Sequence, residues 1–304
     1  MLEARTTAGN LPFPKTEPSK WPTSCTPLSA MRQSFSIFII LSGMLSLVGC
    51  ENANSGSTKD NRSLVVFAAA SLTDALTEIA QPFEEQSGIE VFFNFASSGA
   101  LARQIIAAPR ADLYLSANQK WMDEVANAEL LVPQSRVTLL SNQLTVIANP
   151  TSTFEWVSAE DFATLPFRFL SIGDPASVPA GRYAKLWLQD LAIHPAGKSA
   201  WEALSGKISP ATDVRAALFQ VKSNREVTGI VYRTDAIAYP SAVKIIYSVP
   251  VKEGPDISYP AAILSTANNP EAAEKFMAFL HSPEATDTFE SLGFITTTPP
   301  PAEP

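Results

Sequence analysis

Two serines and two small apolar residues stand where predicted strands give way to predicted helices. Ser71 follows an apolar run at 64–69, and Ser98 follows the next such run, each just before a helical pattern. Ala180 and Val214 lie within one turn of two further predicted helix starts. Helix N-termini at the carboxyl edge of an α/β sheet present unpaired N–H groups and a positive dipole end, which suit an anion. Ordinary helix capping explains any one of these residues more simply, so the spacing alone does not establish a site.

A serine hydrolase is the alternative function that these serines raise. A serine nucleophile needs a positioned base, and the chain has only two histidines, His194 and His281. Neither histidine is near Ser71 or Ser98 in the sequence, and no Gly-x-Ser-x-Gly elbow surrounds either serine. We therefore expect a binding protein and not an enzyme.

Strands alternate with helices along most of the chain. Apolar runs predict strands at 64–69, 90–95, 112–115, 144–148, 169–172, 229–232 and 244–249. Helical spacing of apolar residues predicts helices near 72–79, 101–105, 120–128, 179–191, 214–221, 271–280 and 283–292. Ser71 is the expected N-cap of the first helix, and Thr212 or Asp213 that of the helix at 214. Such alternation with short turns predicts an α/β sheet.

Composition excludes several classes of protein. The 304 residues include 22 lysines and arginines against 30 acidic residues, a net charge of −8 at pH 7. This balance argues against nucleic acid or an anionic membrane surface as a partner, since both require clustered positive charge. Cys25 and Cys50 are the only cysteines, so neither a disulfide framework nor a zinc cluster is expected, and we predict no cofactor.

The first fifty residues are not expected to join the fold. Residues 1–30 hold five prolines and no sustained apolar period, and we interpret them as an upstream extension of the reading frame before a start at Met31. A short positive region and an apolar run at 35–48 then predict a secretory signal. The run ends in LVGC at 47–50, which resembles a bacterial lipobox in which Cys50 is lipidated. A buried helix with a chance cysteine is the alternative.

Two further segments are expected to lie outside the fold. Residues 51–62 are polar and rich in Ser and Asn, as is typical of a tether between an anchor and a domain. Residues 298–304 are proline-rich and are expected to form a disordered tail.

Six ordered segments between about residues 63 and 297 carry a family resemblance. They are FAAASLTDA at 67–75, FASSGALARQ at 95–104, ADL at 111–113 with SANQKWM at 116–122, GDP at 173–175 with VPAG at 178–181, PATDVR at 210–215, and GIVY at 229–232. Together they resemble the periplasmic molybdate-binding proteins of bacterial ABC transporters.

The resemblance implies a set of residues that hold an oxyanion. Transferred to this sequence, the ligands are the hydroxyls of Ser71 and Ser98, the backbone amides of Ala180 and Val214, and the hydroxyl of Tyr232. Molybdenum would be held only as the oxyanion, through these same residues. All of these groups can donate hydrogen bonds, as a tetrahedral dianion that offers only acceptors requires.

The ligand implied is molybdate, with tungstate as a close second. A protonated phosphate would also need an acceptor, which this set does not obviously supply. Sulfate differs mainly in size, so a binder of sulfate or another tetrahedral oxyanion remains the alternative. Gly99 departs from the pattern, because some relatives have a third serine there.

The same resemblance implies the type II periplasmic-binding-protein fold, with two α/β lobes joined by crossing strands. Lobe I is expected to take residues 63–143 and 235–297, and lobe II residues 144–234. The protein would be a monomer that closes on its anion and docks on an ABC permease, held at the membrane by lipid on Cys50. Near the site, the carboxylates of Asp74 and Asp213 are expected to point away from the anion.

Two arginines near the predicted site, Arg103 and Arg215, each lie within a turn of a helix start. They could screen the anion, but we expect them to form surface ion pairs.

Overall fold

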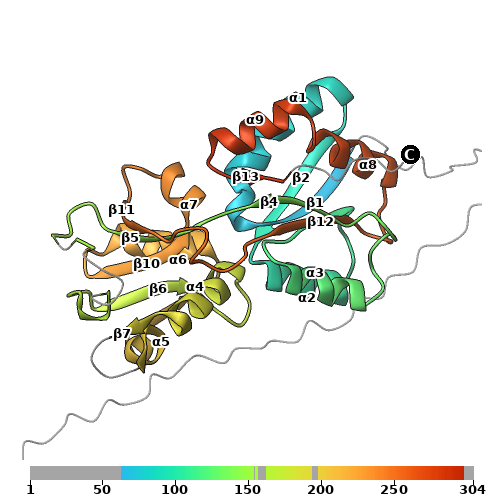
Figure 1. Cartoon of the computed structure of the whole chain (residues 1–304). Helices are drawn as coiled ribbons and strands as arrows, with labels where there is room; N and C mark the ends of the chain where they lie inside the picture. The colour runs from blue at the N-terminus through green and yellow to red at the C-terminus, as the bar shows by residue number, and fades with distance from the viewer. Residues whose placement is uncertain (1–62, 154, 157–161, 194–197, 298–304) are drawn as a thin grey trace, which may run out of the picture. The chain divides into compact units, whose positions relative to one another are not determined.

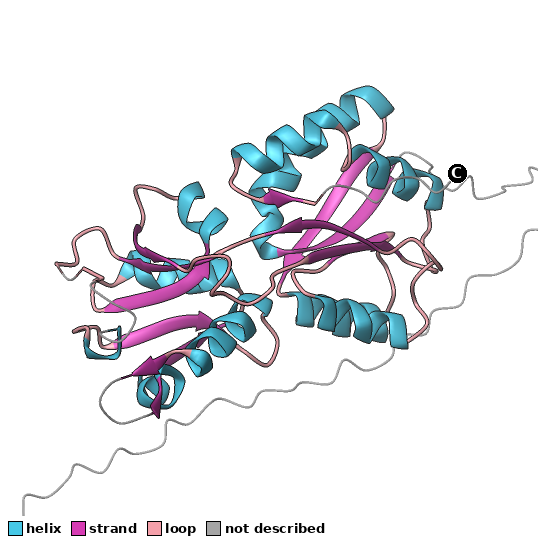
Figure 2. Cartoon of the chain, in the orientation of Figure 1, coloured by secondary structure: helices cyan, strands magenta, loops and turns pink. Residues whose placement is uncertain are grey.

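The computed structural model describes residues 63–153, 155–156, 162–193 and 198–297. The expected extension, signal peptide, lipidated Cys50, tether and C-terminal tail lie outside the described residues. All described residues belong to one compact unit. They form two mixed sheets, each covered by helices, which is the architecture expected from the sequence (Figures 1 and 2).

The first sheet has six strands in the order β13-β4-β12-β3-β1-β2. β1 is parallel to β2 and β3, whereas β12 and β13 pair antiparallel with their neighbours. Its strands are β1 (Ser63–Ala69), β2 (Glu90–Ala96), β3 (Leu113–Leu115), β4 (Val137–Ser141), β12 (Tyr259–Ile263) and β13 (Ile295–Thr296). Its helices are the 3₁₀ turn η1 (Ala70–Leu72), α1 (Thr73–Ser87), α2 (Ser98–Ala107), α3 (Gln119–Asn127), α8 (Pro270–Phe279) and α9 (Pro283–Ser291).

The second sheet has five strands in the order β11-β5-β10-β6-β9. β6 is parallel to β9 and β10, and β5 is antiparallel to β10 and β11. Its strands are β5 (Leu144–Ala148), β6 (Phe169–Gly173), β9 (Ile208–Ala211), β10 (Val227–Tyr232) and β11 (Lys244–Ser248). Its helices are η2 (Phe162–Thr164), α4 (Pro179–Asp190), α5 (Ala200–Leu204), η3 (Ser205–Lys207), α6 (Val214–Ser223) and α7 (Arg233–Ala238), and a small antiparallel pair joins β7 (Ala192–Ile193) to β8 (Lys198–Ser199).

We call each sheet with its helices a lobe. The chain passes from the first lobe to the second between β4 and β5, close to the position expected from the sequence. The return is later than expected. The sequence predicts residues 235–297 in lobe I, but β11 pairs with β5 in the second sheet. The chain therefore returns to the first lobe between β11 and β12.

The central strand β12 was not predicted from the sequence. It is fully buried between β3 and β4, yet it contains Pro260, which cannot donate a ladder hydrogen bond. The register shifts between Tyr259 and Pro260, and this irregularity accommodates the proline. The carbonyl of Pro260 still accepts a hydrogen bond from the Ser116 amide.

The helices that follow parallel strands begin close to where the sequence predicts. One predicted N-cap residue, however, does not cap its helix. Ser71 is not an N-cap, because it lies inside η1, and α1 begins after Leu72 without a side-chain cap. Asp213 caps α6, and Ser97, the neighbour of Ser98, caps α2. Within the described residues, no helix combines the length and apolarity that crossing a membrane requires.

Candidate anion-binding site

The five predicted ligand residues come from five different places in the two lobes. In the first lobe, Ser71 follows β1, and Ser98 is the first residue of α2, separated from β2 only by the N-cap Ser97. In the second lobe, Ala180 and Val214 lie in the first turns of α4 and α6, and Tyr232 is the last residue of β10. All five are buried. Parallel strands end at the same edge of a sheet, and this brings the helix starts of each lobe together.

These five residues line one small pocket, to which both lobes contribute. Its full lining is Ala69, Ala70, Ser71, Ala96, Ser97, Ser98, Ala117, Val178, Pro179, Ala180, Asp213, Val214 and Tyr232. No lysine or arginine is among them. Any anion held here would be bound by hydrogen-bond donors and helix dipoles, without a direct counter-ion.

The hydroxyl of Tyr232 is the most informative group in the pocket. It is fully buried, and within the described residues it makes no hydrogen bond of ordinary geometry, although the Tyr259 ring lies 5.8 Å away between centroids. Burial raises the pKa of this hydroxyl well above its usual value, so it stays protonated and can donate. A buried polar group without a partner carries a free-energy cost that a bound acceptor would remove.

The two serines are held by neighbours that leave donors available. The Ser98 oxygen accepts a hydrogen bond from the Ala117 amide at 2.9 Å, so the hydroxyl proton of Ser98 is free to be donated. The Ser71 oxygen lies 3.2 Å from the Tyr259 hydroxyl, and either oxygen can act as the donor. Both serines can therefore present an O–H group to an anion in the pocket.

Ser71 is connected to a buried polar network that sequence reasoning missed. The Tyr259 hydroxyl accepts a hydrogen bond from the Asn142 side-chain amide at 3.1 Å, and that amide also donates to Thr234 at 2.9 Å. Asn142 lies in the segment that connects β4 of the first sheet to β5 of the second, and Thr234 is in α7 of the second lobe. Nothing in the local sequence around these residues indicates that they meet, because they are far apart along the chain.

The first turns of α4 and α6 supply backbone donors. Val178 is the N-cap of α4 but makes no side-chain cap, and Pro179 has no N–H, so the Ala180 amide is the first donor of that helix. In α6, the Asp213 side chain accepts a hydrogen bond from the Ala216 amide at 2.8 Å. The Val214 amide, which comes earlier in the helix, takes no part in this capping hydrogen bond. Both amides lie where the positive helix dipole is strongest.

Close approach of β6 to α4 requires glycine. A Cβ atom on Gly181 would lie 1.7 Å from the carbonyl oxygen of Gly173, which no side chain can tolerate. This contact holds the start of α4 against the end of its strand. The GDP and VPAG segments thus have a structural reason for their glycines beside any role in binding.

The charged residues near the pocket agree only partly with expectation. The Asp74 carboxylate pairs with Arg215 at 2.5 Å, and Asp213 still lines the pocket although one of its oxygens caps α6. Arg215 forms ion pairs as expected, but it is not a surface residue, since its side chain is only 12% exposed. The prediction of a surface ion pair for Arg103 is wrong, because it has no carboxylate partner among the described residues. Its guanidinium lies 5.4 Å from the Trp121 ring centroid.

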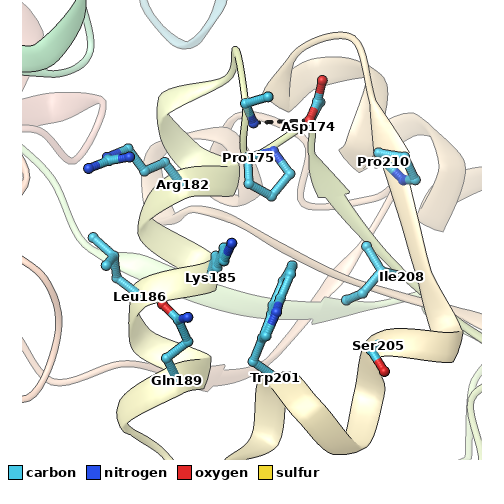
Figure 3. A pocket seen from close by; sticks show the side chains of 11 residues that line it. Asp174, Pro175, Arg182, Lys185, Leu186, Gln189, Trp201, Ser205, Ile208 and Pro210 are labelled. Carbon is cyan, nitrogen blue, oxygen red and sulfur yellow. Dashed lines mark hydrogen bonds between the residues drawn. The ribbon is translucent and has the colours of Figure 1, made fainter.

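A larger cavity, of about 690 Å³, lies elsewhere in the second lobe. Figure 3 shows that α4 lines one side, through Arg182, Lys185, Leu186 and Gln189, and that Trp201 faces them. The Lys185 ammonium lies 5.1 Å from the Trp201 ring centroid. None of the predicted ligand residues lines this cavity, and no buried polar atom without a partner is found in its lining. Size alone therefore does not make it the site.

Nothing in the described part of the chain suggests a directly ligated metal ion. No group of three or more His, Cys, Asp or Glu side chains comes together there in a way that could hold one. The pocket between the lobes has instead the chemistry of a small anion site.

A two-lobed fold with a donor-lined pocket between the lobes defines a solute-binding protein. The chain belongs to the family of bacterial extracellular solute-binding proteins, whose profile matches residues 64–295. This is a family of binding proteins, and the serine-hydrolase alternative is accordingly set aside.

Individual relatives carry more specific names. The chain is 41% identical over 239 residues to the molybdate-binding protein ModA of Escherichia coli, which covers 77% of this chain and 90% of the relative. It is 29% identical to YvgL of Bacillus subtilis, a putative ABC transporter substrate-binding lipoprotein, over 87% of this chain and 99% of the relative. The solved periplasmic molybdate-binding protein of Azotobacter vinelandii shares the fold, with a TM-score of 0.68 and 23% identity over 77% of this chain and all of that one.

Proposed function

We propose that this protein binds molybdate, and tungstate as a close second ligand, outside the cytoplasm and delivers it to an ABC permease. The observation that carries the proposal is the Tyr232 hydroxyl, which is buried and has no hydrogen-bond partner in the described part of the chain. It lies in a pocket that Ser71, Ser98, Ala180 and Val214 also line. The resemblance to the Escherichia coli molybdate-binding protein supports the same ligand.

The donor set favours a fully ionised tetrahedral anion. Two hydroxyls from serine, one from tyrosine and two backbone amides can all donate, and hydrogen bonds to a charged group contribute roughly 1.5–3 kcal/mol each. The carboxylate of Asp213 is the only charged side chain in the lining, and it disfavours anions in general. Helix dipoles from α4 and α6 offset part of that repulsion.

Sulfate binding is the second candidate for the same pocket. Sulfate is also a tetrahedral dianion at neutral pH, so the donor set accepts it as readily as molybdate. The two anions differ in size, and the tight fit of the lobes around a small pocket makes size the property on which selectivity would depend.

Anchoring by lipid on Cys50 completes the proposal for location. The lipobox-like LVGC at 47–50 follows an apolar run, and the Bacillus subtilis relative carries the name of a lipoprotein. A lipid anchor and a polar tether would keep a monomeric binding protein at the membrane surface, where the permease lies.

The test is calorimetric titration of the chain carrying Cys50→Ser with molybdate, tungstate, sulfate and phosphate. One-to-one binding of molybdate and tungstate, with no heat from sulfate or phosphate, is the expected result. Tight sulfate binding with weak molybdate binding would retain the class of protein and replace the ligand. A folded sample that gives no heat with any of the four anions would refute the proposal.

A further inference from the structure

Arg215 lies between two carboxylates that belong to different lobes. Its Nη2 atom is 2.5 Å from Oδ2 of Asp74, and its Nε atom is 2.7 Å from Oδ1 of Asp235. Asp74 is in the first turn of α1 in the first lobe, whereas Asp235 is in α7 of the second lobe, beside Arg215 in α6. The ion pair with Asp74 therefore crosses from one lobe to the other.

Two residues of the second lobe itself orient the side chain of Arg215. The Asp235 side chain is fully buried, and the Tyr239 ring centroid lies 5.1 Å from the Arg215 guanidinium carbon. A guanidinium that pairs with a buried carboxylate and packs on an aromatic ring has lost most of its rotamer freedom. Because the arginine is already oriented, pairing with Asp74 carries a smaller entropy cost.

The pair is immediately next to the proposed ligands without being one of them. Arg215 follows Val214 in the chain, and Asp74 is three residues after Ser71. Arg215 and Asp74 line a neighbouring small cavity that shares Ser71 with the anion pocket, but neither lines the anion pocket itself. The Arg215 guanidinium contacts two carboxylates and does not line the anion pocket.

We propose that Arg215 is a positioning residue that holds the two lobes closed over the anion by pairing with Asp74. The inference rests on the proposed function, because closure matters only if an anion is held between the lobes. An ion pair that exists only when the lobes meet stabilises the closed state and slows its opening. It leaves the encounter of the anion with the open protein unchanged, so it acts on dissociation.

Removing Asp74 has two opposing effects that an experiment must separate. Loss of the pair with Arg215 favours opening, whereas loss of a carboxylate near the anion reduces repulsion. Asp213→Asn serves as the control for the second effect. It also removes one negative charge near the pocket, and asparagine retains the capping of α6.

The experiment compares Asp74→Asn with the unaltered chain by stopped-flow tryptophan fluorescence, using molybdate as the ligand and calorimetry for affinity. We expect the dissociation rate of Asp74→Asn to rise about tenfold and its association rate to stay within about twofold. Asp123→Asn is the matched control, because Asp123 forms a 2.7 Å ion pair with Arg136 inside the first lobe. Its dissociation rate should equal that of the unaltered chain.

Arg215→Lys provides a second variant that keeps the positive charge. The single ammonium group of lysine cannot pair with both carboxylates as the planar guanidinium of arginine does. Arg215→Lys should therefore also accelerate dissociation of the anion. Unfolding temperatures without anion report whether each variant is folded.

The outcomes separate this inference from the proposed function. If the unaltered chain binds molybdate but Asp74→Asn dissociates at the unaltered rate, the inference is wrong and the proposed function stands. The inference also fails if Asp213→Asn accelerates dissociation as much as Asp74→Asn. If the unaltered chain does not bind molybdate, the proposed function itself fails.

Discussion

The amide of Gly99 in the first lobe donates a hydrogen bond to the carbonyl oxygen of Ser177 in the second, at 3.0 Å. Gly99 follows Ser98, and Ser177 lies three residues before Ala180. This contact joins α2 to the start of α4, as the Asp74–Arg215 pair joins α1 to α6. Each first-lobe serine of the proposed site thus has a direct contact to the second lobe beside it.

Gly99→Ala is predicted to weaken molybdate binding by roughly 1–3 kcal/mol, because overpacking at this contact holds the lobes apart. An added Cβ atom would lie 2.5 Å from the Ser177 oxygen and 2.6 Å from the Trp121 ring. Calorimetry measures the change. Gly206→Ala is the control, since a Cβ there meets nothing within 4 Å. Unchanged affinity in Gly99→Ala would mean that the bound form does not contain this contact.

Tyr232→Phe is predicted to move stability and affinity in opposite directions. Without anion, the variant should be as stable as the unaltered chain or more stable, because it removes a buried hydroxyl that has no hydrogen-bond partner among the described residues. Molybdate affinity should fall by roughly 1.5–3 kcal/mol, the contribution of one hydrogen bond to a charged group.

Denaturant unfolding and calorimetry give the two quantities for Tyr232→Phe. Tyr247→Phe is the matched control, because Tyr247 packs on Trp156 in the second lobe and does not line the pocket. A large loss of stability in Tyr232→Phe without anion would show that the hydroxyl has a structural partner.

The free energy of unfolding without anion is predicted to fall as the pH rises from about 4 to about 7, because of the titration of Asp235. Burial raises the pKa of this carboxyl from 3.8 to about 7, although Arg215 opposes the shift. In that range the folded protein keeps a proton that the unfolded chain has released. A raised carboxyl pKa therefore contributes stability at low pH, which is lost as the pH approaches the folded value and stays lost above it.

The measurement is the free energy of unfolding at several pH values in the unaltered chain and in Asp235→Asn. The difference between the two should change with pH by on the order of 1 kcal/mol or more. Asp123→Asn, at a half-exposed carboxylate, controls for the general effect of removing one charge. Parallel pH curves for the unaltered chain and Asp235→Asn would contradict the prediction.

Cys50→Ser is predicted to release the protein from the membrane. Serine cannot be acylated by the lipobox pathway, and a lipid chain is the only anchor proposed for this chain. Cell fractionation, with mass spectrometry of the mature N-terminus, measures the effect. Cys25→Ser should leave the membrane fraction unchanged. An unaltered protein whose mature N-terminus carries no acylated Cys50 would exclude the lipid anchor.

Local sequence signals predict the helix starts around the candidate site, whereas the choice of its ligand residues comes from the family resemblance and stays a prediction. Ser98 and Val214 are the first residues of helices that begin shortly after β2 and β9 end, so the alternation of strand and helix predicts helix starts near them. The capping role of Ser71 was predicted wrongly for a local reason, since a 3₁₀ turn separates β1 from α1. β12 was missed because Pro260 breaks the pattern by which a central strand is recognised.

The predicted ligands, none of which is basic, come from the family resemblance. The sequence by itself determined the alternating strands and helices and the positions of the helix starts. These properties depend on apolar periodicity and on the types of neighbouring residues, which a linear chain displays. Only the tertiary structure decided that Arg215 contacts Asp74, which lies 141 residues earlier, and that the buried Tyr232 hydroxyl has no hydrogen-bond partner in the segments that the structure describes. Both facts depend on how two sheets bring distant segments together, and long-range contacts of this kind leave no periodic trace in the sequence.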